Sequence, residues 1–280
     1  MNRAICTIST YSHLAQSFAM INSLQLFMPQ VQAFILVVDK SSLDVNIQAV
    51  PASIELLYAN SNDIVPYTAP HYKKYRKGSD SLRWSLKPAL LKFIFEQRGI
   101  ESAFYADNDL YFFENPSFLF DELERHSFLL CPHWRIHDPK ASRAWFEVNF
   151  RDGVFNAGFV GATKDGNEIV DWWREACLYE CRISRSRGLY VDQKYLDLVP
   201  AIFENIGIIQ HRGCNVAYWN QIENKRSMKE GKVFINERWP LIFMHITSKL
   251  IASIMDGAEP ALEGYYRQYL DAKATVALLR

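Results

Sequence analysis

Neither sign of charge dominates this sequence: its 280 residues carry 31 lysines and arginines against 31 aspartates and glutamates. A protein held to nucleic acid by a general basic field is therefore not expected, although this balance allows a local phosphate pocket. The sequence also lacks an apolar run of the ~18–20 residues that a membrane-spanning helix needs. Its first apolar stretch is interrupted by Thr7, Ser9 and Thr10, so no signal peptide is expected. Peripheral association with a membrane stays open.

Cysteine is scarce, and the five that occur show no spacing typical of a disulfide framework. An odd number of thiols suits a reducing compartment, so we expect a cytoplasmic protein. Cys177 and Cys181 lie one helical turn apart and are interpreted as buried helix cysteines rather than zinc ligands. The histidines of residues 133–137 alternate with Trp and Arg, which suits a substrate-facing loop better than a closed zinc site.

Two common phosphate-binding signatures are missing as well. No GxGxxG and no P-loop lysine occurs where the first strand turns into the first helix, so neither a dinucleotide fold nor a Walker-type ATPase is supported. If the protein binds phosphates, a divalent cation is the obvious device to hold them. The sequence also lacks internal repeats and low-complexity linkers. Because 49% of its residues are hydrophobic, the core can be large, and we expect one domain over residues 1–280.

What the sequence does contain is an alternation of apolar strands and amphipathic helices. The expected strands are Ala4–Ile8, Ala33–Val38, Ile54–Tyr58, one ending at Ala106, Phe128–Cys131, Asp152–Ala162, Ile206–Ile209 and Leu241–His245. The expected helices are one from Leu14 to Met28 capped by Thr10 or Ser12, one beginning near Pro88, Pro116–Arg125, Asn167–Cys181 and Pro260–Leu279. Residues 66–79 are expected to form a loop on the surface or over a substrate. The β–α–β–loop–β opening indicates an α/β fold of the nucleotide-binding type.

The segment YADNDLYFF brings Asp107, Asn108 and Asp109 to the end of an apolar strand. In open α/β sheets, ligands bind just beyond the carboxyl ends of strands. Aspartates at i and i+2 can both face one hard cation, with waters and substrate phosphates completing its shell. Alternatively, these residues form a turn that closes a β-hairpin into Leu110–Phe113, because Asp and Asn favour tight turns. The spacing by itself leaves both interpretations open.

Three further stretches place polar residues where a ligand could bind. Asp152–Ala162 contains three glycines as well as Asn156, and glycine in a strand often marks the close approach of a ligand. Asp192 and Gln193 are expected at the start of a short helix. His245 is expected at the end of a late strand.

These motifs together resemble the GT-A glycosyltransferases, and most closely glycosyltransferase family 8. The resemblance implies a single Rossmann-like GT-A domain with a mixed, mostly parallel central sheet flanked by helices. DND fits the family's DxD motif, so Asp107 and Asp109 would bind Mn²⁺ (or Mg²⁺), and Asn108 would contact the donor. His245 would be the third protein ligand of the metal. Lys249 would be the diphosphate-binding lysine, although HITSK here is shorter than the family's HxxGxxKPW and lacks its glycine and tryptophan.

The resemblance also implies where the sugar binds and reacts. FNAG would cradle the donor sugar through Asn156, Ala157 and Gly158. VDQ fits the Asp-Gln pair that lies beside the anomeric carbon and the acceptor, which makes Asp192 and Gln193 the candidate catalytic residues.

The remaining donor contacts are assigned from the chemistry of a nucleoside diphosphate. Its leaving group gathers negative charge as the glycosidic bond breaks, and a divalent cation stabilises that charge. Lys87 or Arg83, near the start of a helix, would take the remaining phosphate charge. The base would bind at the polar tip of the first strand, at Thr7, Ser9 and Tyr11, with Tyr11 able to stack on it.

The implied activity is transfer of a sugar from a UDP-linked donor to an acceptor hydroxyl. Family 8 members retain the anomeric configuration, and segments such as RWSLKP resemble bacterial sugar transferases, which implies a role in surface glycan or glycoconjugate synthesis. The acceptor would be a glycan, a lipid-linked molecule or a protein. Two other classes stay open: a metal-dependent nucleotidyltransferase or phosphoesterase, and a non-catalytic sugar-binding module.

Overall fold

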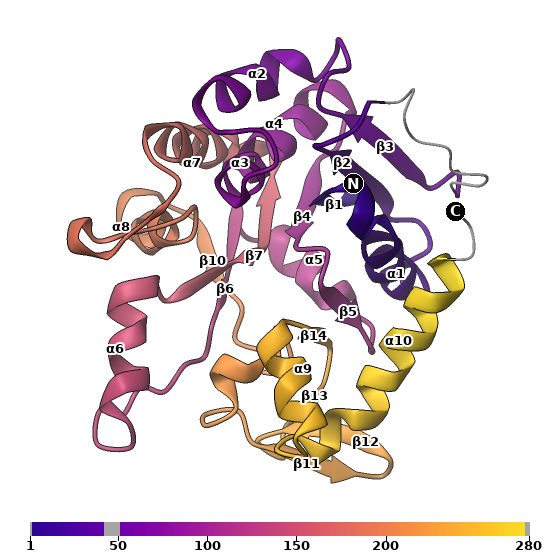
Figure 1. The fold of residues 1–280 in the computed structure, drawn as a ribbon, viewed down its shortest axis with the longest axis vertical. Helices are drawn as coiled ribbons and strands as arrows, with labels where there is room; N and C mark the ends of the chain where they lie inside the picture. The colour runs from indigo at the N-terminus through magenta and orange to yellow at the C-terminus, as the bar shows by residue number, and fades with distance from the viewer. Residues whose placement is uncertain (1, 42–50, 278–280) are drawn as a thin grey trace.

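A seven-stranded sheet forms the centre of the computed structural model, which describes residues 2–41 and 51–277 (Figure 1). In spatial order its strands are β10 (Ile206–Ile208), β6 (Phe128–Pro132), β7 (Phe155–Thr163), β4 (Ser102–Ala106), β1 (Arg3–Ser9), β2 (Gln32–Val37) and β3 (Ile54–Tyr58). β7 runs antiparallel to its neighbours β4 and β6, and the other pairs are parallel. The predicted α/β fold with a mixed, mostly parallel sheet is confirmed. The prediction of one domain stays a prediction.

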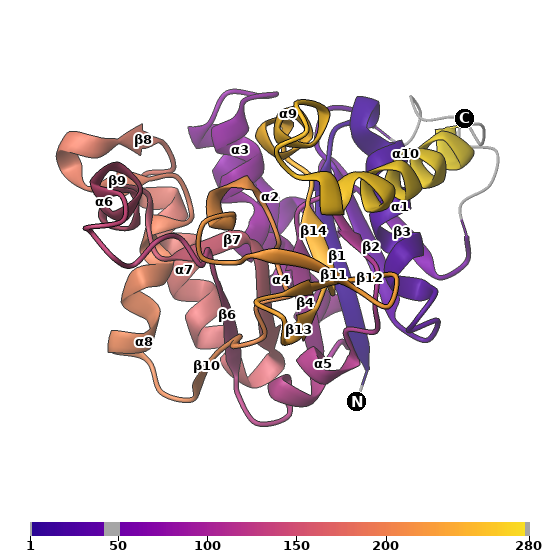
Figure 2. The same ribbon diagram turned by 90° about the horizontal axis from the view of Figure 1, so that it is seen from below.

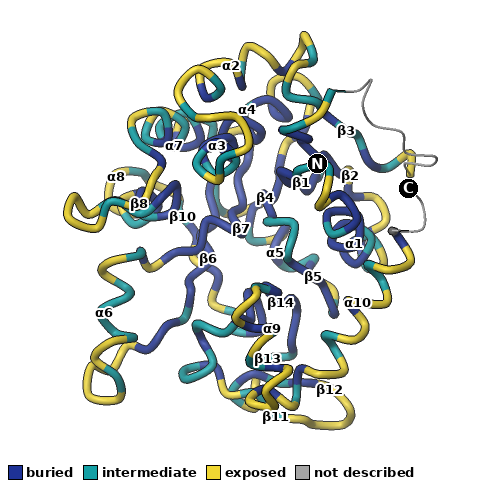
Figure 3. Tube along the Cα trace, in the orientation of Figure 1, coloured by how far each residue is buried: buried dark blue, intermediate teal, exposed yellow. Residues whose placement is uncertain are grey.

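Helices cover both faces of this sheet. In chain order they are α1 (Leu14–Gln25), α2 (Val65–Lys74), α3 (Asp80–Ser85), α4 (Lys87–Gln97), α5 (Ser117–Leu123), α6 (Arg143–Asp152), α7 (Asn167–Tyr179), α8 (Val199–Ile202), α9 (Ser248–Met255) and α10 (Glu263–Ala277). Successive residues of a strand point to opposite faces. In β1, Ala4 and Cys6 therefore join the hydrophobic cluster under α4 and α7, while Ile5 joins the cluster under α1 and α5. The central strands are buried along most of their length (Figure 3).

Seven short strands of the described chain lie outside the central sheet. They form the pairs β5 (Leu110–Phe112) with β14 (Phe243–His245) and β8 (Ile183–Ser184) with β9 (Leu189–Tyr190), and the three-stranded sheet β11 (Arg226–Lys229), β12 (Lys232–Ile235) and β13 (Trp239–Pro240). A third hydrophobic cluster, which includes Tyr111, Met244 and Tyr269, joins β5 and β14 to the final helix α10. Figures 1 and 2 both show α10 alongside α1, and Figure 2 shows α3 and α9 near the end of the sheet opposite the N-terminus.

The prediction of a loop over residues 66–79 was wrong, because α2 covers Val65–Lys74. Pro66 lies in the first turn of α2, where its missing N–H would have no helical partner in any case. The helix is fixed by buried polar contacts: the Thr68 hydroxyl donates to the carbonyl of Ala59 at 3.1 Å, and His71 Nδ1 lies 3.1 Å from Ser85 Oγ. The segment is polar because most of the side chains of α2 are exposed to solvent or only partly buried.

Two smaller predictions are also corrected. The hairpin alternative is wrong, because β4 pairs with β1 and β7, whereas β5 pairs with β14. A tight turn does exist, with Leu110 N donating to Asp107 O at 3.1 Å, but it sends the chain out of the central sheet. Neither Thr10 nor Ser12 caps α1 through its side chain; the N-cap residue is His13, and its Nδ1 lies 2.7 Å from the Thr10 hydroxyl.

The remaining expected elements are present, with ends that shift by a few residues. The terminal helix was predicted to reach Leu279, and positions 278–280 lie outside the described residues. All five cysteines are buried and free; Cys177 lies in α7 and Cys181 just beyond its end. Within residues 2–41 and 51–277, no helix combines the length and the apolar character that crossing a membrane requires.

Candidate functional site

Three potential metal ligands meet where β4 leaves the sheet. Asp107 follows β4, Asp109 precedes β5 and His245 ends β14. The antiparallel register places His245 opposite Leu110, so its imidazole lies beside both carboxylates. His245 Nε2 is 3.0 Å from Asp109 Oδ1 and 4.0 Å from Asp107 Oδ2. In the described part of the chain, this is the one group of three or more His, Cys, Asp or Glu whose ligand atoms all lie within 4.8 Å of one another.

The donor set of this cluster fits a divalent cation such as Mn²⁺ or Mg²⁺. Carboxylate oxygens are the ligands that these cations prefer, and an imidazole adds a borderline nitrogen ligand. Asn215 orients the imidazole: His245 Nδ1 lies 3.2 Å from Asn215 Oδ1, so Nδ1–H donates to the amide and Nε2 faces the carboxylates. Asn215 is fully buried. Sequence analysis did not identify Asn215 as an orienting residue.

The charges of the cluster are mutually dependent in the absence of a cation. Burial by itself lowers the pKa of His245, but the facing carboxylates of Asp109 and Asp107 raise it above its ordinary value. Burial likewise raises the pKa of Asp109, and the imidazolium of His245 lowers it below its ordinary value. Protonated His245 therefore supplies the positive charge that a divalent cation would otherwise place beside the two carboxylates. Binding of a cation must release this proton.

A buried lysine connects the metal ligands to the candidate catalytic carboxylate. Lys87 Nζ lies 3.3 Å from Asp107 Oδ1 and 3.1 Å from Asp192 Oδ2, and donates to the carbonyl of Ala157 at 3.1 Å. Burial opposes the charge of Lys87, but the two carboxylates raise its pKa well above its ordinary value. Burial raises the pKa of Asp192, and Lys87 counteracts that rise. Asp192 is held from the other side by Trp173, whose indole N–H donates to its carbonyl at 2.9 Å.

The glycine of FNAG allows β7 to approach the metal ligands closely. A Cβ added at Gly158 would lie 2.6 Å from Asn156 Oδ1 and 2.7 Å from both Asp107 Oδ2 and His245 Cε1. Real Cβ atoms do not make contacts this short, so any other residue at position 158 would displace the side chains of the cluster. The Asn156 amide oxygen accepts a hydrogen bond from Gly158 N at 2.5 Å. The amide group of Asn156 is thereby fixed beside the cluster.

Two cavities meet at Trp84, Lys87 and Asp107, which line both of them. The first, of about 410 Å³, contains the DND segment and is rich in cations; its other lining residues are Ile8, His13, Gln16, Arg83, Tyr105, Asn108, Asp109, Ile246, Ser248, Ile251, Tyr266, Tyr269, Leu270 and Lys273. We call it the donor-side cavity. The second, of about 320 Å³, is rich in aromatic rings; its other lining residues are His133, Arg135, Trp145, Val148, Asp152, Asn156, Ala157, Gly158, Ile183, Tyr190, Val191, Asp192, Gln193, Tyr218, Trp219, His245 and Thr247. We call it the aromatic cavity.

The aromatic cavity contains the sugar-binding and catalytic residues expected from the sequence. Asn156, Ala157 and Gly158 line it from β7, and Asp192 and Gln193 line it from the segment before a short 3₁₀ helix. Gln193 is fixed by its side-chain amide, which donates to the carbonyl of Asp152 at 2.6 Å. From the segment 133–137, His133 and Arg135 line the cavity, which agrees with a substrate-facing loop.

The residues expected to bind the base lie beside the donor-side cavity rather than on its wall. Thr7 and Ser9 are fully buried in β1. Asn108 Nδ2 lies 3.4 Å from Ser9 Oγ, which links the tip of β1 to the DND segment. The backbone N–H of Tyr11 donates to Asp39 Oδ1 at 2.8 Å. From this stretch of chain, Ile8 and His13 reach the cavity wall instead.

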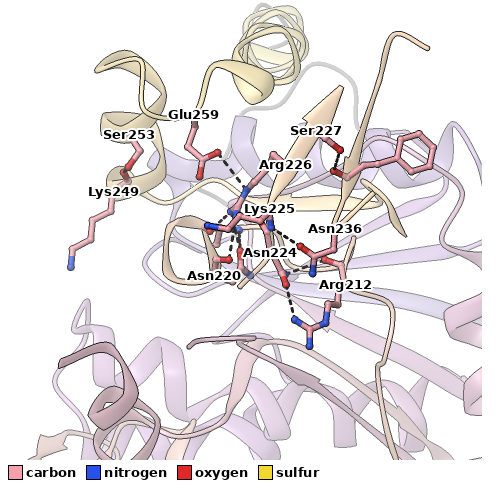
Figure 4. A network of polar contacts seen from close by, with 12 residues as sticks. Arg212, Asn220, Asn224, Lys225, Arg226, Ser227, Asn236, Lys249, Ser253 and Glu259 are labelled. Atoms are coloured by element: carbon pink, nitrogen blue, oxygen red, sulfur yellow. Dashed lines mark hydrogen bonds and ion pairs between the residues drawn. The ribbon is translucent and has the colours of Figure 1, made fainter. Parts of the chain in front are cut away.

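Lys249 lies apart from both cavities. It is exposed in the first turn of α9, and its ammonium group lies 4.9 Å from the centre of the Tyr218 ring. Figure 4 shows its side chain extending away from the buried network in which Arg226 bonds to Glu259. Arg226 also donates to the carbonyl of Ala217 at 2.7 Å, and so fixes the segment that carries Tyr218.

Sequence reasoning missed most of the residues that build the cavity walls. Tyr266, Tyr269 and Lys273 belong to α10, whose amphipathic pattern indicates only that one face is buried. Trp145 belongs to α6, which was not expected as a helix, and Trp219 lies in a segment without a recognisable periodicity.

Comparison with known proteins agrees with this fold. No protein-family profile matches the chain. Two proteins of Bacillus subtilis (strain 168), the uncharacterized proteins YfnF and YfnD, are 28% and 29% identical to it. The two alignments cover 91% and 98% of this chain and 84% and 85% of the relatives.

Two solved glycosyltransferase structures have a similar fold. The galactosyltransferase LgtC, in complex with donor and acceptor sugar analogs, superimposes with a TM-score of 0.56 at 13% identity, over 97% of this chain and 95% of LgtC. Mouse xyloside xylosyltransferase 1 gives a TM-score of 0.51 at 13% identity, over 89% and 99% of the two chains. The chain therefore has a fold of the GT-A type.

Proposed function

We propose that this protein is a metal-dependent glycosyltransferase, related to family 8, that moves a sugar from a UDP-linked donor to an acceptor hydroxyl. The observation that carries this proposal is the Asp107–Asp109–His245 cluster at the junction of a cation-rich and an aromatic cavity. A sugar nucleotide has a charged diphosphate half and a neutral sugar half. Here each half has a cavity of matching character, and the cluster lies between them, where the bond to be broken would lie.

Asp107, Asp109 and His245 would hold the cation, which when bound neutralises charge on the departing diphosphate. Lys87 lies between Asp107 and Asp192 and is largely enclosed by them. It therefore sets the position of a metal ligand and of the candidate catalytic carboxylate together. Its charge also counteracts the rise that burial causes in the pKa of Asp192.

The sugar would bind in the aromatic cavity. Asn156 would meet its hydroxyls, and Ala157 and Gly158 would let it approach the backbone closely. Asp192 and Gln193 would lie beside the anomeric carbon and the acceptor. The proposed reaction retains the anomeric configuration, as in the resembled family, and no side chain is assigned as a covalent nucleophile.

The base would bind at the tip of β1, with Tyr11 as the stacking ring and Asn108 joining Ser9 to the metal site. The acceptor would be a glycan, a lipid-linked molecule or a protein, and the cellular role would be synthesis of a bacterial surface glycan or glycoconjugate in the cytoplasm. The relatives in Bacillus subtilis support a bacterial setting.

A donor-hydrolysis assay tests the proposal. The protein is incubated with a panel of sugar nucleotides and Mn²⁺, and the released products are identified. Slow release of UDP from one sugar nucleotide, abolished by EDTA and by His245→Ala, is the expected result. Release of inorganic phosphate would indicate a phosphoesterase instead, and no product despite binding would indicate a sugar-binding module. Far-ultraviolet circular dichroism of the variant controls for its folding.

A further inference from the structure

The last helix of the described chain forms one wall of the donor-side cavity. Tyr266, Tyr269, Leu270 and Lys273 line it together with Asp107 and Asp109. Their spacing of three, four and seven residues places these four side chains on one face of α10. The helix is held there by packing: α10 runs along α1 (Figure 1), and the Tyr269 ring contacts the Tyr111 ring of β5 at a centroid distance of 5.6 Å.

Among the cations of this cavity, Lys273 differs from the others in having no carboxylate partner. Lys87 is enclosed between Asp107 and Asp192, and Arg83 is paired with Asp80. For Lys273, the described residues offer no ion pair or side-chain hydrogen bond, and its ammonium group lies 5.9 Å from the centre of the Tyr269 ring. The side chain is partly buried and lines the donor-side cavity.

A diphosphate bound at the metal site would need a further cation to offset its negative charge. Asp107 and Asp109 together balance the two charges of a divalent cation, so a bound diphosphate would bring negative charge that they do not offset. Lys249, which the family resemblance suggested for this purpose, is exposed and lines neither cavity; its ammonium group lies over Tyr218, which belongs to the aromatic cavity and not to the donor-side cavity. The departure of HITSK from the family's longer motif is consistent with that position.

We propose that α10 completes the donor site and that Lys273 binds the diphosphate of the nucleotide in place of Lys249. This inference rests on the proposed function, because it assigns a residue to the same donor. Lys273 and Tyr269 line the same cavity as the DND segment, so a diphosphate bound beside that segment would lie in the cavity that Lys273 lines. The chemistry recognised is a nucleoside diphosphate chelated to a divalent cation.

Binding of UDP and of inorganic pyrophosphate, each with MnCl₂, is measured by isothermal titration calorimetry. The variants are Lys273→Ala, Lys273→Arg, Lys249→Ala and, as the matched control, Arg267→Ala. Arg267 lies on the same helix, is exposed and pairs with Glu263, so it tests the effect of removing a cation from α10 outside the cavity. Pyrophosphate reports on the phosphate contacts alone, since it carries no base.

Lys273→Ala should weaken both ligands about tenfold, the usual loss for a hydrogen bond to a charged group. Lys273→Arg should restore most of the affinity, and Arg267→Ala should leave it unchanged. A smaller dependence of affinity on salt in Lys273→Ala would further support a direct charge contact.

Wild-type affinity for UDP in Lys273→Ala would overturn the inference while leaving the proposed function intact. A loss in Lys249→Ala instead would return the role to that lysine. If the wild-type protein binds neither UDP nor pyrophosphate with Mn²⁺, the proposed function and this inference fail together.

Discussion

The two cavities share Trp84, Lys87 and Asp107, but their remaining walls differ in chemistry. The donor-side cavity presents the unpaired ammonium group of Lys273, whereas the charged groups of the aromatic cavity are paired or buried among rings. Within the aromatic cavity, the ring of Trp219 packs edge-on against two histidines, His133 at 5.3 Å and His245 at 5.0 Å. Burial and Arg135 hold the pKa of His133 well below its ordinary value, while that of His245 is raised. Since both histidines line the same cavity, the charges that face a buried group, and not burial alone, decide the direction in which its pKa shifts.

If one cavity binds the diphosphate and the other holds the reacting groups, loss of the shared carboxylate of Asp107 should impair both UDP binding and turnover. Asp107→Asn keeps the shape of the side chain but removes a metal ligand and the partner of Lys87. We expect metal-dependent UDP binding to fall on the order of a hundredfold or more, because Lys87 and the cation each lose a buried charge partner. Turnover should fall with it. Calorimetry with and without Mn²⁺ measures the first effect; an unchanged affinity in a folded variant would remove Asp107 from the metal site.

A change confined to the aromatic cavity should separate binding from chemistry. Asp192→Asn should lower turnover about 10²–10³-fold, as loss of a preorganised charge at the reacting centre does. Its affinity for UDP with Mn²⁺ should fall less than in Asp107→Asn, because Lys87 loses one of its two carboxylate partners but Asp107, Asp109 and His245 all remain. Measuring kcat and the affinity for UDP in the same variant tests this prediction. Equal losses of both quantities would show that the two cavities do not act separately.

A substitution of Asn156 can separate contacts to the sugar of the donor from contacts to its UDP. Asn156→Ala should weaken the sugar nucleotide about tenfold through loss of hydrogen bonds to the sugar, and leave UDP affinity nearly unaltered. The two ligands are titrated into the same protein sample in the presence of Mn²⁺. Parallel losses for both would place Asn156 at the diphosphate and not at the sugar.

The smallest effect expected is on stability. The folded-state pKa of His133 is lowered, so below about pH 6.5 the unfolded chain takes up a proton that the folded protein does not. This group therefore contributes a free energy of unfolding that falls by up to about 1.4 kcal/mol per pH unit as the pH drops below ~6.5. His245 has the opposite sign: its contribution is present below ~6.5 and is lost as the pH rises through its raised folded-state pKa.

Urea unfolding at pH 7 and pH 5.5 compares the wild type with His133→Asn. Asn can still donate to the carbonyl of Val154, which lies 3.1 Å from His133 Nδ1. The variant should lose about 1 kcal/mol less stability than the wild type between the two pH values. An identical loss in both proteins would mean that His133 is protonated in the folded state.

Local patterns predicted the elements that carry the site, and tertiary contacts decided the rest. Short continuous apolar runs located β4 and β14, and so the strand ends at Asp107 and His245. Periodicity could not reveal that β5 pairs with β14, since that register depends on distant residues. The segment of α2 was misread as a loop because its two prolines and exposed basic residues resemble loop composition. The amphipathic pattern of α10 indicated a buried face, but a pattern does not say which surface covers it.

The pairing of β5 with β14 also bears on how the molecule is assembled. Asp109 and His245 are brought together by one short antiparallel pair that closes a loop containing about half of the chain. Contacts of such high sequence separation carry a large loop-closure cost and are slow to form. A partly folded chain without this pair would therefore lack a complete set of ligands and could not capture a cation or begin to consume donor. Once the pair has formed, any cation that binds only the folded protein adds to its stability in proportion to the logarithm of the free ion concentration. The metal site would thus form late in folding and then stabilise the folded protein.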